Sequence, residues 1–204
     1  VNTQYVIVNY IFWYLTMTII NSVGYEIINE AMRGTLEQLS MSPMGIWRIM
    51  ITRLISITFI QTLIVVGLLY ISMATASQWL NVDVITLLPI VLLTFIGMFG
   101  ISFIIAGISI IIKQIQAFLQ ILQFILMALA FVPLSLSPFL QLLPFVKGID
   151  MVRAVMIHGV SLSEFAVTDF LILIANSLVY FLLGLFVFNY CEKIAMEKGV
   201  LAHY

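Results

Sequence analysis

The stretch from residue 87 to residue 112 decides the fold, and it reads LLPIVLLTFIGMFGISFIIAGISIII. None of its residues is charged, and it is long enough to cross a bilayer. About 30 Å of hydrocarbon, at a rise of about 1.5 Å per residue, requires about 20 apolar residues. The whole chain has the same character: of its 204 residues, 63% are hydrophobic and 8% are charged. Since a soluble domain is roughly 25% charged, the sequence predicts a membrane protein and excludes a soluble enzyme domain.

Further apolar stretches of similar length flank this one. We expect five helical spans, at residues 5–24, 54–76, 87–112, 117–136 and 165–190. Helices are favoured over the strands of a membrane barrel, because the runs exceed about 10 residues and do not alternate between apolar and polar positions. The prediction is an all-α polytopic membrane protein in which residues 1–204 form a single transmembrane domain.

The basic residues predict how the spans are oriented. Six of them lie at the ends assigned to one side, and only Lys147 and Arg153 fall on the other side. The six are Arg33, Arg48, Arg53, Lys113, Lys193 and Lys198. Because cytoplasmic loops carry the excess of Lys and Arg, we expect the N-terminus outside and the C-terminus in the cytoplasm. An outside N-terminus without a signal peptide would be explained by an upstream span, so we expect six spans in the full chain.

The cytoplasmic segment from residue 25 to residue 53 is expected to contain a short helix, Leu36 to Met41, lying across the membrane surface. The signals are Gly34 as a helix breaker, Thr35 and Gln38 as a capping box, and Ser42-Pro43 as the start of the next helix. The alternative is that this helix is a plain connector between two spans.

On the other side, Pro133, Pro138 and Pro144 interrupt an apolar stretch that is too broken to span. Apolar backbone of this kind is tolerated at membrane depth where protein buries it, so we expect an external re-entrant segment. An amphipathic helix should follow Pro144 and end at Gly159, and Ser161 to Glu164 should form a capping box that opens the last span. Its apolar face would be Phe145, Ile149, Val152 and Met156, with Lys147, Asp150 and Arg153 linked at i, i+3 spacing.

Two sets of small or polar residues lie inside the predicted spans. Glutamines spaced i, i+4, i+7 would form a polar stripe that either joins helices or lines a pathway. Glycines on one face of the third span would permit close packing of helices. The two sets are Gln116, Gln120 and Gln123, and Gly97, Gly100 and Gly107.

The sequence offers little for catalysis or metal binding. His158 and His203 lie outside the spans, Cys191 is the single cysteine, and there is no Gly-x-x-x-x-Gly-Lys-Ser/Thr phosphate loop. A formal net charge of −1 argues against nucleic-acid binding. We expect no metal and no cofactor on this chain. An intramembrane enzyme and a non-transporting assembly protein remain as alternatives at this point.

Two strings of residues resemble a known family. Residues 30–43, EAMRGTLEQLSMSP, resemble the first cytoplasmic loop of ABC type 2 exporter permeases. Residues 143–153, LPFVKGIDMVR, resemble the external segment of that family, in which a proline precedes a helix that ends in arginine. Pro144 and Arg153 are the more diagnostic positions there. The amphipathic N-terminal helix and first span of the family have no counterpart in this sequence.

The resemblance implies a six-span permease in the plasma membrane that pairs with a second permease. Two separate ATPase subunits would drive it, and these would carry ATP and Mg²⁺. The transported substrate would be hydrophobic or amphipathic, such as a drug, a lipid, a glycan carrier or a peptide. The short cytoplasmic helix would contact the ATPase through Leu36, Glu37, Gln38 and Leu39, supported by Glu30 and Arg33.

Overall fold

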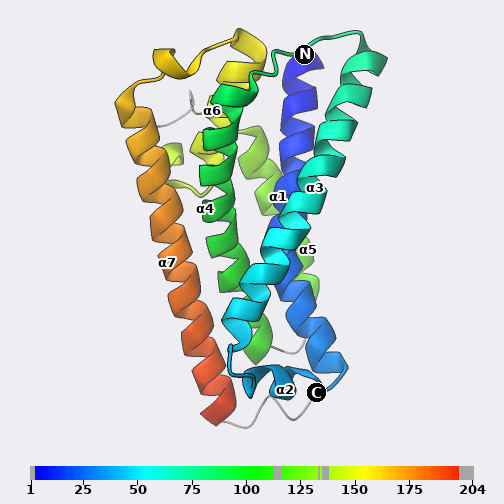
Figure 1. Cartoon of the computed structure of the whole chain (residues 1–204), viewed down its shortest axis with the longest axis vertical. Coiled ribbons are helices and arrows are strands. Elements are labelled where there is room, and N and C mark those ends of the chain that lie inside the picture. Colours follow the sequence, from blue (N-terminus) through cyan, green and yellow to red (C-terminus); the bar gives the residue numbers. More distant parts are fainter. Residues whose placement is uncertain (1–2, 113–115, 133, 135–137, 198–204) are drawn as a thin grey trace.

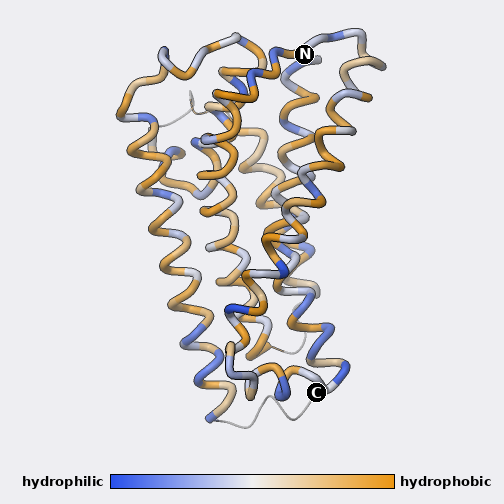
Figure 2. Tube along the Cα trace, viewed as in Figure 1, coloured by the Kyte–Doolittle hydropathy of each residue, from blue (hydrophilic) through white to orange (hydrophobic). Residues whose placement is uncertain are grey.

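The computed structural model describes residues 3–112, 116–132, 134 and 138–197, and every regular element in this part of the chain is helical (Figure 1). The four long helices are α1 (Thr3–Met32), α3 (Ile46–Ala76), α4 (Val84–Ile111) and α7 (Val167–Glu197). Each is long and apolar enough to cross a membrane. Figure 2 shows apolar residues along most of their length. The prediction of an all-α polytopic membrane protein is confirmed.

The loops divide between the two ends of the bundle as the sequence predicts. The start of α1, the loop at residues 77–83 and α6 (Val146–His158) lie at one end (Figure 1). The short helix α2 (Leu36–Ser40) and the last turns of α7 lie at the other end. The two groups of loops are therefore separated by the length of the helices. The assignment of the α2 end to the cytoplasm remains a prediction from the basic residues.

Helix α5 (Gln116–Phe131) corrects the fourth predicted span, 117–136. Its 16 residues extend about 24 Å, which is less than the ~30 Å hydrocarbon core. A proline at position 133 disfavours the helical conformation at Val132. The helix therefore ends at Phe131, although the apolar sequence from which the span was predicted continues beyond it. Residues 133, 135 and 136 lie outside the described part. The first, second, third and fifth predicted spans correspond to α1, α3, α4 and α7.

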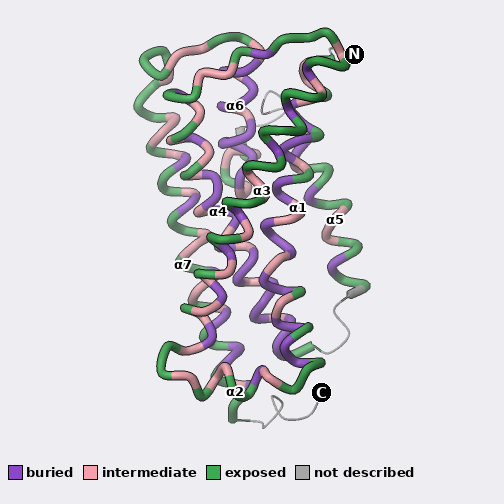
Figure 3. The backbone as a smooth tube through the Cα atoms, turned by 45° about the vertical axis from the view of Figure 1, so that its right-hand side comes forward, coloured by how far each residue is buried: buried purple, intermediate pink, exposed green. Residues whose placement is uncertain are grey.

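Helix α1 is the centre of the bundle. It packs against α3, α4, α5 and α6, and buried residues occur along most of its length (Figure 3). The outer faces of α3 and α7 are exposed and apolar, as expected for helices that face lipid. The core is thus organised around a helix whose polar side chains must find partners inside the protein.

The glycines of α4 lie where the sequence predicts close packing, against α7. The backbones are closest at Gly100 and Gly184, where a Cβ on Gly100 would lie 2.2 Å from the carbonyl oxygen of Tyr180. Gly97 and Gly107 also face α7, opposite Ser177 and Phe188. The prediction that these glycines permit helix packing is confirmed.

The external segment folds back into the bundle. A 3₁₀ helix, η2 (Pro138–Leu142), is held by α7, because the side-chain amide of Asn176 donates to the carbonyl oxygens of Gln141 and Leu143 at 2.7 and 3.0 Å. Asn176 is nine residues beyond the start of α7, which is about 14 Å along the helix axis. The carbonyls that it binds therefore lie well below that helix end, in agreement with the predicted re-entrant segment.

Helix α6 confirms part of the prediction and corrects the rest. It follows Pro144 and ends at Gly159, whose φ of +69° suits glycine. However, Lys147 and Arg153 are only 8% and 4% exposed, so α6 has no polar face turned to water at these positions. The four predicted apolar positions, Phe145, Ile149, Val152 and Met156, are all buried.

Three predicted capping signals form different contacts. The Thr35 hydroxyl does not cap α2, and Gln38 therefore has no capping box to complete. Helix α3 begins at Ile46 after Gly45, whose φ is +72°, instead of at Ser42-Pro43. The hydroxyl of Ser161 does donate to Glu164 at 3.0 Å. That contact closes the 3₁₀ turn η3 (Leu162–Glu164), and α7 begins only at Val167.

Candidate functional site

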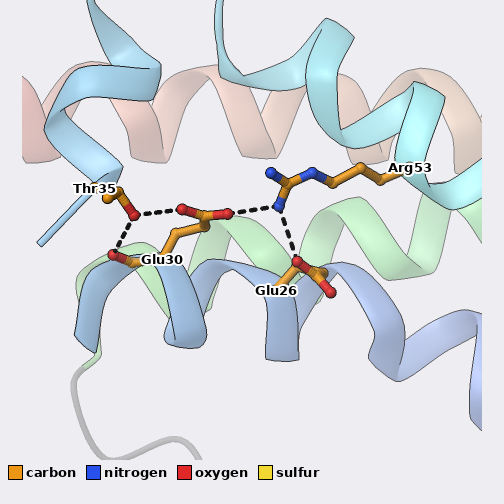
Figure 4. Close-up of polar contacts among 4 residues, drawn as sticks. All are labelled: Glu26, Glu30, Thr35 and Arg53. Atoms are coloured by element: carbon orange, nitrogen blue, oxygen red, sulfur yellow. Dashed lines mark hydrogen bonds and ion pairs between the residues drawn. The ribbon is translucent and has the colours of Figure 1, made fainter. Parts of the chain in front are cut away.

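A cluster of charges joins α1 to α3 near the α2 end of the bundle (Figure 4). One nitrogen of the Arg53 guanidinium, Nη1, lies 2.9 Å from a Glu26 carboxylate oxygen and 2.7 Å from a Glu30 carboxylate oxygen. Glu26 and Glu30 are one helical turn apart on α1, so a single cation on α3 reaches both. Two carboxylates and one guanidinium leave this cluster with a net negative charge.

The same cluster holds α2. Thr35, which directly precedes α2, donates its hydroxyl to the free carboxylate oxygen of Glu30 and lies 3.2 Å from the Glu30 carbonyl oxygen (Figure 4). Within α2, the side chain of Leu36 is fully buried and that of Leu39 packs partly against the core. The short helix is therefore fixed to the bundle by an apolar anchor and by a hydrogen bond to a charged group.

The outward surface of α2 differs from the predicted contact set. Leu36 is buried inside this chain, so it cannot also be a contact for another protein in this conformation. Glu37 and Gln38 are exposed, and Met41 and Met44, which follow α2, are 78% and 55% exposed. Methionine is a flexible, polarizable residue found at adaptable binding surfaces. The exposed surface at α2 thus consists of the two polar residues Glu37 and Gln38, followed by the two methionines Met41 and Met44.

A groove of about 500 Å³ runs along α1 between α3 and α5. Several of its lining residues carry polar groups, although most of the surface that they expose to the groove is apolar. The lining residues include Tyr14, Thr18, Asn21, Ser22, Tyr25 and Glu26 of α1, Ile57 of α3 and Gln123 of α5. A polar surface at membrane depth needs partners, either protein, water or a ligand.

Two polar groups of the groove have no hydrogen-bond partner among the described residues. Asn21 is 5% exposed, and its amide donates to the Met17 carbonyl while its Oδ1 accepts nothing. The indole N–H of Trp13, one further lining residue, is also buried and unpaired. Both atoms are buried in the wall of the groove, so in this conformation neither is presented at its open surface.

Glu26 belongs to both the groove and the charge cluster. A continuous path of contacts therefore leads from α2 through Thr35, Glu30 and Arg53 to a carboxylate that lines the groove. The sequence signal for this path is the pair of glutamates one turn apart beside an apolar span, since ionisable residues there are rare and usually functional.

The structure describes the side chains of two of the three glutamines in the predicted polar stripe. Gln123 lines the groove, which favours the pathway reading at that position, whereas Gln120 is exposed. The side chain of Gln116 lies outside the described residues. Arg33, a predicted supporting residue of the contact surface, is exposed beside the charge cluster.

The predicted external residues form a separate, buried cluster. The Arg153 guanidinium donates to Asn9 Oδ1 at 2.6 Å and to the carbonyl oxygens of Ala130 and Val132 at the end of α5. Burial lowers the pKa of Arg153, while Tyr5 and Asp150 act in the opposite direction. Lys147 binds Asp169 at 2.7 Å instead of Asp150. This cluster ties α6 to α1, α5 and α7.

Groups of metal-binding residues are not found within the described part of the chain. His158 ends α6, Cys191 is buried and free, and His203 lies outside the described residues. The geometry offers a groove, a charge cluster and an exposed short helix.

Comparison with known proteins identifies the family. Residues 1–186 match the family described as ABC-2 family transporter protein. Neither the curated proteins nor the solved structures gave a match. The matched residues include the charge cluster, α2, the groove and the external segment, which are the features found above by geometry. The chain therefore belongs to the ABC-2 family of transporter proteins and is a membrane component of an ABC transporter.

Proposed function

We propose that this chain is the transmembrane subunit of an exporter that is driven by ATP hydrolysis on two separate ATPase subunits. The observation that supports this proposal most directly is the path of contacts from α2 to the groove. A displacement of α2 acts on Thr35, and through Glu30 and Arg53 it acts on Glu26 at the groove. ATP and Mg²⁺ would be bound by the ATPase subunits.

The ATPase would contact the exposed surface at the α2 end. Glu37 and Gln38 supply polar contacts, and Met41 and Met44 supply adaptable apolar area. Leu36 and Leu39 would act from beneath, by holding α2 rigidly against the bundle. Glu30 and Arg33 would support the contact from the end of α1. A rigid α2 is needed because a loosely attached helix would absorb the displacement instead of transmitting it.

The groove would form part of the substrate path. It combines aromatic side chains, such as Trp13 and Tyr14, with polar lining residues such as Ser22 and Glu26. This mixture suits a hydrophobic or amphipathic substrate, in the class of drugs, lipids, glycan carriers or peptides. Because the groove opens on one side of the bundle, a second permease copy would be needed to enclose it. The plasma membrane would hold the dimer, with the C-terminus in the cytoplasm.

The test is substrate-stimulated ATP hydrolysis by the purified permease–ATPase complex in lipid nanodiscs. Glu37→Lys should weaken association with the ATPase, because it reverses an exposed charge on the contact surface. Glu164→Lys is the matched control, since it reverses an exposed charge at the other end of the bundle. Arg53→Met should leave association intact but reduce stimulation, because it breaks the path between α2 and the groove.

The proposal fails if Glu37→Lys and Arg53→Met both retain wild-type association and wild-type stimulation. In that case α2 is only a connector between spans. Sidedness is tested separately by cysteine labelling of intact cells. Trp79→Cys should react with an impermeant thiol reagent and Trp47→Cys should not. The reverse pattern would contradict the orientation while leaving the contact path open to its own test.

A further inference from the structure

A second cavity lies in the other half of the bundle, between α1, α3 and α4, and α6 closes it at one end. Its volume is about 290 Å³. Its walls are apolar, with Ile11 and Phe12 from α1, Val65 from α3, Phe95 from α4 and Val152 from α6. Thr62 is the single polar side chain among the described lining residues, and its hydroxyl already donates to the Thr58 carbonyl oxygen at 2.7 Å.

Water does not suit this cavity. An enclosed water needs two to four polar partners, whereas apolar cavities of about 150 Å³ stay dry and bind small hydrocarbons. This cavity is larger, and its wall atoms would lose dispersion contacts if it stayed empty. The occupant must therefore be apolar.

The cavity opens sideways, toward lipid. Val66 of α3 and Leu88 and Leu92 of α4 line it, and all three are also exposed on the outer surface of the bundle. Helices α3 and α4 diverge toward the end that carries α6, on either side of α1 (Figure 1). The opening is continuous with the lipid-facing surface of two membrane spans, so the medium at its mouth is hydrocarbon.

The depth of the cavity corresponds to one leaflet. The α4 residues that line it fall between Val84 and Phe95, the first twelve residues of the helix, which extend about 17 Å. Half of a hydrocarbon core is about 15 Å. We propose that this cavity binds one acyl chain of a phospholipid from the leaflet at the α6 end, and that the chain fills the space between α3 and α4.

The proposal is tested by photolabelling the purified chain in nanodiscs of phosphatidylcholine that carries a diazirine on its acyl chain. Phe12, Val65 and Phe95 are buried, so a label on them requires a chain inside the cavity. We expect labelling of these three residues well above that of Ile19, which is fully buried elsewhere on α1. Labelling of the three at the Ile19 level would overturn the proposal, whether the cavity is closed or covered by protein.

A filling substitution gives the second arm. Val91→Phe, in the cavity wall, should reduce labelling of Phe12 and Val65 to the Ile19 level. Val179→Phe, on the exposed face of α7, is the matched control and should leave that labelling unchanged. Val65→Phe fills the cavity from α3 and replaces Val91→Phe if the latter unfolds. Unchanged labelling of Phe12 in a folded filling variant would overturn the proposal.

The last arm separates the two sources of such a chain. A diazirine fatty acid is added to nanodiscs of unlabelled phosphatidylcholine, and the same three residues are mapped. Weaker labelling than with the diazirine phospholipid at equal content supports a phospholipid as the occupant. Labelling by the fatty acid alone would show a free fatty acid site and would overturn the proposal.

Discussion

Replacing Gly184 by alanine should weaken the packing of α7 against α4. A Cβ at position 184 would lie 2.1 Å from the carbonyl oxygen of Gly100 and 2.7 Å from its carbonyl carbon. These are backbone atoms, so the two helices must separate by about 1.3 Å to reach ordinary contact, and neighbouring contacts lose part of their dispersion energy. Overpacking of this kind costs about 1–3 kcal/mol.

Helix propensity acts in the opposite direction and needs a control. Alanine is favoured over glycine inside a helix by about 1 kcal/mol. Gly67 in α3 has open space around its Cβ position, so Gly67→Ala measures the propensity term alone. The difference in unfolding free energy between the two variants should therefore be about 1–3 kcal/mol, with Gly184→Ala the less stable.

The assay is thermal unfolding of each purified variant in the same detergent, followed by circular dichroism. For a chain of this length, the packing cost corresponds to a Tm difference of roughly 2–12 °C. Gly100→Ala should have a similar effect, and the double variant should cost less than the sum, because one displacement relieves both clashes. Equal stability of Gly184→Ala and Gly67→Ala, within about 0.5 kcal/mol, would refute the close crossing.

Three further predictions concern the external cluster, and the same unfolding assay checks the first two. Arg153→Met should cost at least about 1–3 kcal/mol, because it leaves the buried acceptors of Asn9 and Ala130 without a partner. A loss below about 1 kcal/mol would contradict the contacts. Lys147→Met alone should destabilise the protein, whereas adding Asp169→Leu should restore stability, since the second change removes the uncompensated carboxylate. Asn176→Leu should speed proteolytic cleavage within residues 138–144, because η2 loses the two hydrogen bonds that hold it. An unchanged cleavage rate would show that η2 is held by packing alone.

Features that depend on neighbouring residues in the chain could be predicted from the sequence. The four long helices follow from the length of the apolar runs, and Gly34 and Gly159 break helices at positive φ as expected. The glycine face of α4 follows from the helical period. In each case the signal lies within one element, so no knowledge of the tertiary arrangement was needed.

Features that depend on distant partners could not be predicted. The spacing predicts that Arg153 is linked to Asp150, and the two lie 3.8 Å apart, but the buried partner Asn9 is 144 residues away in the sequence. Thr35 has the sequence of a helix cap, yet a buried carboxylate five residues earlier is the stronger acceptor for its hydroxyl. Composition likewise does not distinguish the 16-residue α5 from the longer membrane-spanning helices, because all of them are apolar.

The groove shows the same limit within the candidate site. Glu26 and Glu30 could be recognised from their spacing, but their shared cation, Arg53, comes from the following helix. Asn21 and Trp13 gave no sequence signal, because single polar residues in an apolar helix usually find partners in the bundle. Their unpaired atoms are visible only once the neighbouring helices are in place.

The short α5 has a consequence for how the protein is made. A helix of 16 residues is a poor substrate for insertion as an independent span, and its last carbonyl groups cannot stay unpaired in lipid. The carbonyl groups of Ala130 and Val132 at its end are bound by Arg153 of α6, which is synthesised after it. Biogenesis should therefore place α1, α3 and α4 first and seat α5 only after α6 has been synthesised. A chain interrupted before α6 would leave the carbonyl groups at the end of α5 unpaired in the membrane, which is the kind of defect that membrane quality control removes.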